Sequence, residues 1–272
     1  MKTISTGYFA PESIFRKVWR ERLQLLGATR ALLMQLAHPL VASGVAGYSH
    51  FQSDPLKRLH RTVDTMVAII FGEKSQADAA LAKLNHIHQQ VKGKLPFSAG
   101  PFPKGSSYSA NDPDLKLWVH ATLMDTGLWT YEYFVKPLSS KEKKLFYKDS
   151  QKLASLMGIP QQMIPPTLDD FNEYLKNMLE SGVITVTPQA KKLAADIINP
   201  PVKPILKPFV GLVNTVAAYS LPKSLREAYG LKYTKGDQAR LKMMTQAIQV
   251  FLPLTPPIVR FMHLPKSFLT KR

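Results

Sequence analysis

The chain has 272 residues, with 36 Lys and Arg against 19 Asp and Glu, so its formal net charge is +17 at neutral pH. Hydrophobic residues make up 45% of the chain and charged residues 20%, a balance that supports a buried core and excludes wholesale disorder. The absence of cysteine excludes a disulfide scaffold, a thiolate metal site and a cysteine nucleophile.

The first ten residues, MKTISTGYFA, contain no apolar core of signal-peptide length. No run of the sequence reaches the ~18 uninterrupted apolar residues that span a bilayer. We therefore expect a cytoplasmic protein without a transmembrane helix. The positive charge favours acidic partners, an anionic membrane surface among them, and improved solubility is the alternative explanation. No nucleic-acid-binding motif is present, so no specific nucleic-acid partner is predicted.

Helix start and stop signals recur along nearly the whole chain. In chain order, the first helices are expected after Gly27 up to His38-Pro39, from Ser53-Asp54-Pro55 to Gly72, from a cap at Ser75 to Gly93, and from Asn111-Asp112-Pro113 through Phe134. Further helices are expected from Ser139 to Met157, from Thr167 to Ser181, after Thr187-Pro188, and over 209–220, 223–229 and 235–252.

Other structure is scarce in this pattern. The best strand candidate is Val183–Thr187, residues 95–109 read as a loop, and the proline-rich segment 199–208 reads as a connection. The prediction is a single all-α domain over residues 1–272, in which 230–272 form a C-terminal helix and a proline-containing tail.

One histidine lies on the apolar stripe of the helix expected to end at Gly93. Leu84, Ile87, His88 and Val91 follow the i, i+3, i+4, i+7 spacing of one helix face. His86 lies about 200° away around the helix, so the two histidines cannot chelate one metal together. His88 is therefore expected to point inward, either as a structural core histidine or as an axial metal ligand.

The helix after Pro55 has one apolar and one polar face. The apolar face carries Leu56, Leu59, Val63, Met66 and Val67, and the polar face carries Arg58, Arg61, Thr62 and Thr65. The polar face is either a solvated surface or a set of cations and hydroxyl donors that line a pocket.

Two later helices carry further candidates. On the helix that starts at Pro113, His120 shares a stripe with Leu117, Ala121, Met124 and Leu128 and is a second inward histidine, whereas Trp118 and Trp129 suit packing. On the helix after Ser139, one side presents Lys141, Lys144, Lys148 and Lys152. This stripe is either a solvated face or a contact for an anionic membrane.

Several common chemistries lack their motifs. The sequence has no Walker loop, no G-x-S-x-G elbow, no His-Glu-x-x-His zinc helix and no Glu-x-x-His pattern of di-iron bundles. Between Glu21 and Glu73 the only acidic residues are Asp54 and Asp64. The sequence therefore offers few carboxylate pairs for hydrolysis by a general acid and a general base.

Three segments occur together in a known order and spacing. They are GATRALLMQLAHPLVASGVAGYSHFQSDPLKRLHRTVDTMVAIIFG, HIHQQVKGK and YSANDPDLKLWVHATLMDT. This set resembles the DUF2236 family, which includes the catalytic domain of latex-clearing rubber oxygenases and the fungal oxygenase MpaB. The resemblance is dense over residues 27–133 and weaker to about residue 229.

The resemblance implies an all-α fold with a globin-like core that holds heme b and its iron. Its R-x-x-[basic]-T pattern falls on Arg58, Arg61 and Thr62, which implies the distal side of the heme. Its H-x-x-V-x-G pattern falls on His88, which implies the proximal iron ligand, and His120 becomes the second candidate ligand or a supporting group.

We therefore predict a heme-dependent oxygenase that uses O₂ and an apolar, isoprenoid-like or lipid-like substrate. Arg58, Arg61 and Thr62 are the predicted catalytic residues, and Arg58, Arg61, His88 and His120 are the predicted cofactor-binding residues, with His88 on the metal. No Glu occurs from Arg22 to Gly72, so the distal glutamate of the rubber oxygenases is missing here. A helical protein that binds heme or lipid without turnover, and a basic peripheral membrane protein, are the alternatives.

Overall fold

The fold is all-α, as the sequence predicts: helices make up 71% of the structure. This structure, a computed structural model, describes residues 7–48 and 55–262, and for residues 55–58 it describes the backbone alone. The predicted helix start at Ser53-Asp54 and the end of the predicted C-terminal tail therefore lie outside the described residues. The globin-like arrangement of the core stays a prediction.

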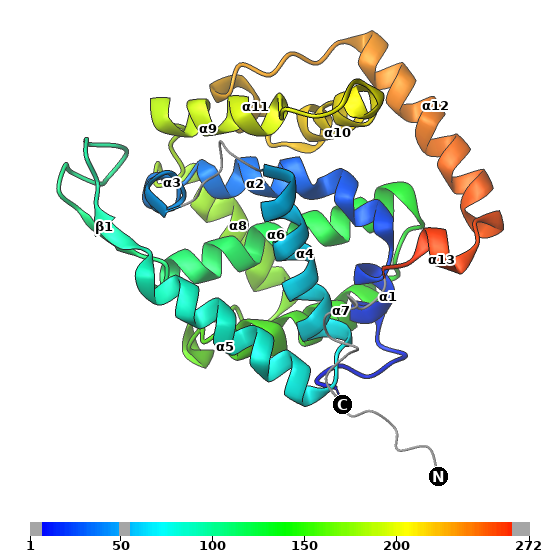
Figure 1. Ribbon diagram of the computed structural model, residues 1–272, viewed down its shortest axis with the longest axis horizontal. Helices are drawn as coiled ribbons and strands as arrows, with labels where there is room; N and C mark the ends of the chain where they lie inside the picture. The colour runs from blue at the N-terminus through cyan, green and yellow to red at the C-terminus, as the bar shows by residue number, and fades with distance from the viewer. Residues whose placement is uncertain (1–6, 49–54, 263–272) are drawn as a thin grey trace.

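The described residues form thirteen α-helices, four short 3-10 helices and two short strands (Figure 1). The α-helices are α1 (Ile14–Trp19), α2 (Ala28–Leu36), α3 (Pro39–Tyr48), α4 (Pro55–Phe71), α5 (Lys74–Gln90), α6 (Pro113–Phe134), α7 (Ser140–Leu156), α8 (Leu168–Glu180), α9 (Pro188–Ile198), α10 (Lys207–Ser220), α11 (Lys223–Ala228), α12 (Lys235–Phe251) and α13 (Pro257–Arg260). The 3-10 helices are η1 (Arg22–Gly27), η2 (Gln161–Met163), η3 (Pro204–Leu206) and η4 (Leu252–Leu254), and the strands are β1 (Lys92–Lys94) and β2 (Ser107–Ser109).

Most predicted helix starts are confirmed because the capping side chains act as expected. Asp112 accepts hydrogen bonds from the backbone N–H groups of Asp114 and Leu115 at the start of α6. Ser139 and Glu142 form a reciprocal capping box at the start of α7. Such caps satisfy backbone donors that the first helical turn leaves without partners.

Three local predictions are wrong. The cap of α5 is Glu73 rather than Ser75, since Glu73 and Gln76 form the capping box. The segment 183–187 is not a strand, because Thr187 instead caps α9 and its hydroxyl accepts from the Ala190 N–H. The helix predicted to end at Gly93 ends at Gln90, and β1 follows it; the last three residues of the predicted loop 95–109 form β2, which pairs antiparallel with β1.

The long helix α6 runs through the centre of the molecule (Figure 1). Its Trp118 is fully buried and donates its indole N–H to the Met34 carbonyl on α2 at 3.2 Å. The main cluster of buried apolar residues extends in sequence from Phe9 to Leu225 and includes Met34, Trp118 and Met124. The main core therefore joins the N-terminal helices to helices as far along the chain as α11.

A buried ion pair links α2 to α6 inside this core. Arg30 Nη2 lies 2.6 Å from the Asp125 carboxylate, and the Arg30 side chain is 7% exposed. The same guanidinium donates to the Thr126 hydroxyl at 2.5 Å and to the Ser220 carbonyl at 3.1 Å, and it packs over the ring of Trp129. Because Ser220 ends α10, this one side chain joins three helices.

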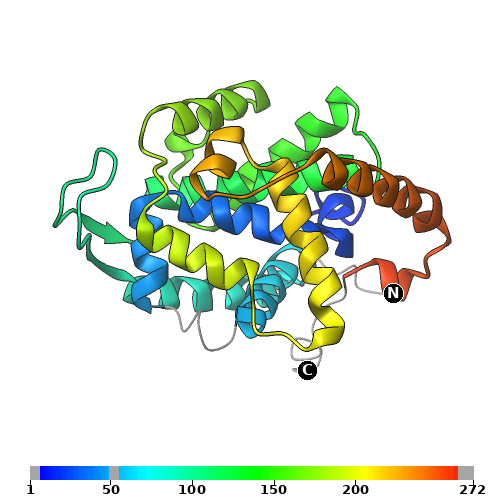
Figure 2. The ribbon, with the colours of Figure 1, turned by 90° about the horizontal axis from the view of Figure 1, so that it is seen from above.

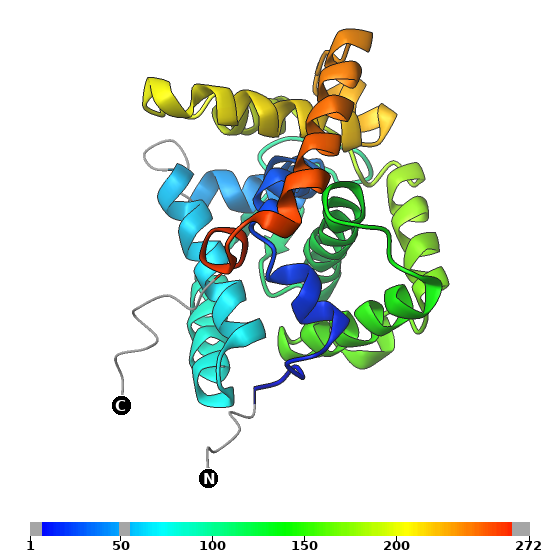
Figure 3. The same ribbon diagram turned by 90° about the vertical axis from the view of Figure 1, so that its right-hand side faces the viewer.

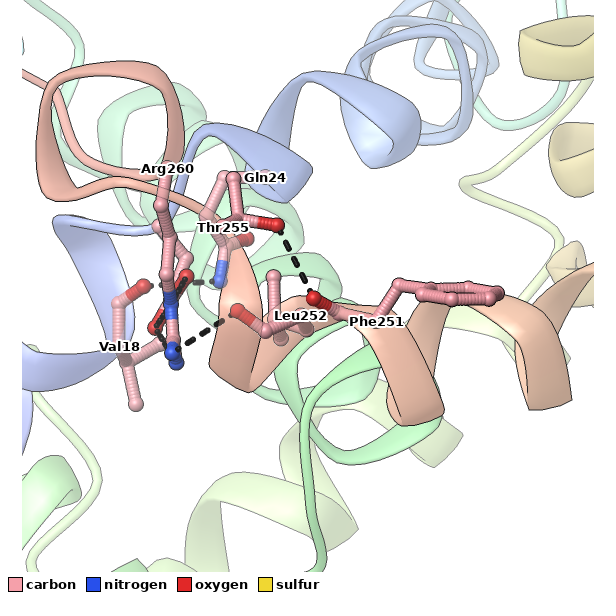
Figure 4. A network of polar contacts seen from close by, with 7 residues as sticks. Val18, Gln24, Phe251, Leu252, Thr255 and Arg260 are labelled. Atoms are coloured by element: carbon pink, nitrogen blue, oxygen red, sulfur yellow. Dashed lines mark hydrogen bonds and ion pairs between the residues drawn. The ribbon is translucent and has the colours of Figure 1, made fainter.

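The C-terminal segment is attached to the N-terminal part of the chain (Figure 4). Arg260 in α13 makes a bidentate ion pair with Glu21, with contacts of 2.6 to 3.1 Å, and Glu21 is only 1% exposed. The Met262 N–H donates to the Arg20 carbonyl at 2.7 Å. Residues more than 230 positions apart are thus held together by charged and backbone hydrogen bonds.

None of the single helices in the described part of the chain is long and apolar enough to cross a bilayer. By length and composition only, the pair Arg22–Leu36 and Pro39–Tyr48, bent by 108°, passes the same test together.

Candidate functional site

Helices α4 and α5 are joined by a two-residue turn, Gly72 and Glu73, and pack against each other. They diverge from this turn, and α5 runs back from it (Figure 1). The first turns of α4 and the last turns of α5 therefore lie at the same end of the pair. Arg61 and Thr62 are in the first half of α4, and His88 is in the last turn of α5.

The His88 ring is half-buried, and its Nδ1 atom is fully buried without a hydrogen-bond partner among the described residues. Burial lowers the pKa of His88, and the nearby positive charge of Lys116 on α6 lowers it further. Both effects favour the neutral imidazole, which is the form that binds a metal ion. A buried nitrogen without a partner costs free energy that coordination to a ligand would relieve.

The helix stripe from which we predicted an inward His88 is buried only in part. Ile87, which shares that stripe, is 49% exposed, and Val91 lies beyond the helix as its C-terminal cap. His86 is exposed, as predicted, and its Nε2 lies 3.2 Å from the Gln90 amide nitrogen. The end of α5 is therefore more solvated than its sequence pattern suggests, although the His88 ring still reaches inward.

His120 is buried as predicted, with 2% of its surface exposed. Its Nδ1 also lacks a hydrogen-bond partner within the part of the chain that the structure describes. Burial lowers the pKa of His120 to about 4. The ring is thus neutral at pH 7 and carries an unsatisfied polar atom in an apolar core, whereas the unpartnered Nδ1 of His88 lies at the more solvated end of α5.

The structure describes the side chains of only two of the three predicted distal residues, Arg61 and Thr62. Arg61 and Thr62 are both exposed on α4, and the apolar face of the helix turns inward through Val67. Arg58 lies on the first turns of α4, but its side chain is outside the described residues. The polar face of α4 therefore exists as predicted, and its role as a pocket lining stays a prediction.

Two titratable residues near this region were missed by the sequence reasoning. His38 is 4% exposed, its ring lies 5.4 Å from that of Phe102, and burial lowers its pKa to about 4 although Asp112 opposes the shift. Lys116 is half-buried, and burial lowers its pKa. His38 stood in a helix-ending His-Pro pair, and the apolar residues around that pair were the signal that it would be buried.

We expect the buried histidines to make the protein sensitive to mild acid. The pKa of His120 falls from 6.5 in the unfolded chain to about 4 in the fold. The stability that the fold gains by keeping His120 neutral is therefore fully present above pH 6.5. It is lost as the pH falls from 6.5 through 4, because the unfolded chain then binds a proton that the folded protein does not. Between pH 7 and pH 5 this loss amounts to about 2 kcal/mol.

Urea unfolding of wild type and His120→Gln at pH 7 and pH 5 measures this contribution. The variant should lose about 2 kcal/mol less than wild type over this interval. His86→Gln is the matched control, because His86 is exposed, and it should behave as wild type. Equal losses in wild type and His120→Gln would contradict the assigned burial effect.

Other features of the described residues lie apart from this region. An open groove of about 400 Å³ runs along α8 and is lined by Asp170, Glu173, Tyr174, Asn177, Met178, Ser181 and Val183. It includes none of the predicted site residues. In the described ranges, no group of three or more His, Asp or Glu side chains could hold a metal ion. A heme differs from such a site because the porphyrin supplies most of the iron ligands and the protein often one imidazole.

The fold and these residues define an all-α protein with a buried histidine, His120, in its central helix and a half-buried histidine, His88, whose Nδ1 atom is buried. The family of ER-bound oxygenase mpaB and rubber oxygenase catalytic domains matches residues 15–250. The chain therefore belongs to this family of oxygenase catalytic domains. The family suggests a metal or heme cofactor, and it implies a small-molecule substrate and O₂.

Two mycobacterial proteins are similar to this chain. The uncharacterised proteins Mb2261 of Mycobacterium bovis and Rv2237 of Mycobacterium tuberculosis are each 25% identical to it over 232 residues, which cover 83% of this chain and 87% of theirs. No solved structure matches.

Proposed function

We propose that this protein is a heme b-dependent oxygenase of an apolar, isoprenoid-like or lipid-like substrate, with His88 as the iron ligand. The observation that carries the proposal is the buried, unpartnered Nδ1 of a neutral His88, at the same end of the α4–α5 pair as Arg61 and Thr62. A bound heme would supply the oxygen activation that oxygenation of such a substrate requires.

The histidines fit a heme ligand in charge and in hydrogen bonding. The low pKa of His88 keeps its imidazole neutral, and Lys116 disfavours protonation from the side of α6. No described residue bonds to Nδ1, so this nitrogen is free to coordinate the iron. His120, with the same unpartnered Nδ1, is the alternative ligand.

The first half of α4 would supply the polar groups of the distal side. Arg61 carries a permanent positive charge that cannot act as a base, so it would bind and orient oxygen or a carboxylate of the cofactor. The Thr62 hydroxyl would donate a hydrogen bond toward the same region. Arg58 lies one helical turn before them and would hold a propionate group.

The proposal is tested by heme reconstitution of the purified protein. We expect a Soret band and heme and iron contents near one per chain, followed by O₂ consumption with an unsaturated isoprenoid or fatty acid. Binding of heme without O₂ consumption with either substrate class would favour the non-catalytic alternative. The missing distal glutamate also supports that alternative. A protein that takes up no heme would overturn the proposal.

A further inference from the structure

Residues 203–209, which comprise η3 and the first turn of α10, carry large apolar side chains on the surface of the molecule. All seven residues from 203 to 209, with the sequence KPILKPF, are exposed. Ile205 is 82% exposed, Phe209 49% and Leu206 43%. These three exposed side chains within five residues form an apolar tip, and grouped apolar side chains of this kind are typical of an interaction surface.

Positive charge surrounds this apolar tip. Lys203 and Lys207 flank Ile205 and Leu206, and both lysines are exposed. The sequence from 197 to 226 contains no Asp or Glu, so no acidic residue near in the chain opposes these two lysines. The segment therefore complements a surface that is both apolar and negatively charged.

The tip is held in place before any partner binds. Pro204 and Pro208 fix their own backbone torsions, and the Leu206 N–H donates to the Lys203 carbonyl at 2.9 Å. Behind the tip, α10 is anchored by Val213 and Val216, which are buried against the body of the protein. An element with this little freedom loses little conformational entropy on binding.

The tip lies on the side of the molecule where α4 begins. Figures 2 and 3 both place the N-terminal end of α10, in yellow, on the same side as the N-terminal end of α4. In Figure 3 this end of α10 extends past the helices beneath it. A surface that contacts the tip would therefore face the half of α4 that carries Arg61 and Thr62.

We propose that residues 203–209 dock the protein on a bilayer that contains anionic lipid, with Ile205, Leu206 and Phe209 inserted and Lys203 and Lys207 at the headgroups. Apolar side chains between lysines match the apolar interior and negative surface of such a bilayer. Docking by itself needs no cofactor. Delivery of an apolar substrate from the bilayer toward α4 is the consequence that rests on the proposed function.

Co-sedimentation with vesicles of equimolar phosphatidylcholine and phosphatidylserine tests the role of the lysines. The double variant Lys203→Glu/Lys207→Glu should weaken partitioning about tenfold or more, since each lysine near an anionic surface contributes about fivefold. The matched control is Lys141→Glu/Lys144→Glu on α7, where both lysines are exposed and the change in formal charge is the same. Equal weakening by the two pairs would overturn the proposal, because binding would then follow net charge alone.

Insertion of the tip is tested separately. Because the chain has no native cysteine, Ile205→Cys can be labelled at one site with a polarity-sensitive fluorophore. Its emission should shift to the blue with anionic vesicles and stay unchanged with pure phosphatidylcholine. Ser75→Cys, at an exposed polar residue near the start of α5, is the control and should not shift.

The remaining variant separates lipid binding from self-association. Ile205→Ser/Phe209→Ser should lose vesicle binding while its sedimentation in solution and its thermal unfolding stay as in wild type. A change of oligomeric state in this variant, or absence of wild-type binding to anionic vesicles, would overturn the proposal. The heme spectrum is read in parallel, so a failure of cofactor binding is distinguished from a failure of docking.

Discussion

Replacing His88 with alanine is expected to abolish the Soret band of the reconstituted protein and to weaken heme affinity about 100-fold or more. The reason is that His88 offers a neutral imidazole with a buried, unpartnered nitrogen, beside a lysine that disfavours its protonation. Heme titration followed by absorbance measures the affinity. The far-UV circular dichroism should stay unchanged, because His88 lies at the half-solvated end of α5.

Three further variants make this result specific. His86→Ala removes an exposed histidine from the same helix and should leave the spectrum intact. His88→Gly with added imidazole should recover the band, because a free imidazole can occupy the space of the missing ring. If His120→Ala loses the band while His88→Ala keeps it, the ligand is His120 and the assignment to His88 is wrong.

Replacing Arg30 with methionine is expected to lower the free energy of unfolding by about 3 kcal/mol, at the lower end of the range for breaking a buried ion pair. The change leaves the Asp125 carboxylate, the Thr126 hydroxyl and the Ser220 carbonyl without the cation that now bonds to all three. Asp125 keeps 30% of its side chain exposed, so water can solvate it in part. Urea unfolding at pH 7 measures the loss.

An exposed ion pair supplies the matched control for this change. Lys223 and Glu227 lie 3.8 Å apart on α11, with 78% and 64% of their side chains exposed. Lys223→Met should change stability by less than about 0.5 kcal/mol, as solvated pairs do. The double variant Arg30→Met/Asp125→Leu should recover part of the loss, because it leaves no unpaired carboxylate. Equal effects of Arg30→Met and Lys223→Met would contradict the structural role of Arg30.

The sequence by itself determined the helices that carry local signals. Asp112, Ser139, Thr167 and Thr187 each cap a helix where predicted, because capping needs only a side chain and the backbone two or three residues later. Periodicity also placed His120 in the core, since its neighbours on α6 are apolar on the same stripe. The family followed from the order and spacing of three segments.

Only the tertiary structure decided features that depend on distant contacts. The short β1–β2 hairpin, the exposure of Ile87 and the burial of His38 arise from what packs against each segment, which local patterns do not contain. The bond network of Arg30 and the pairing of Glu21 with Arg260 likewise join residues far apart in the chain. The 199–208 segment read as a simple connection, yet its apolar tip is exposed, because solvent exposure is fixed by the packing of the whole chain rather than by local sequence.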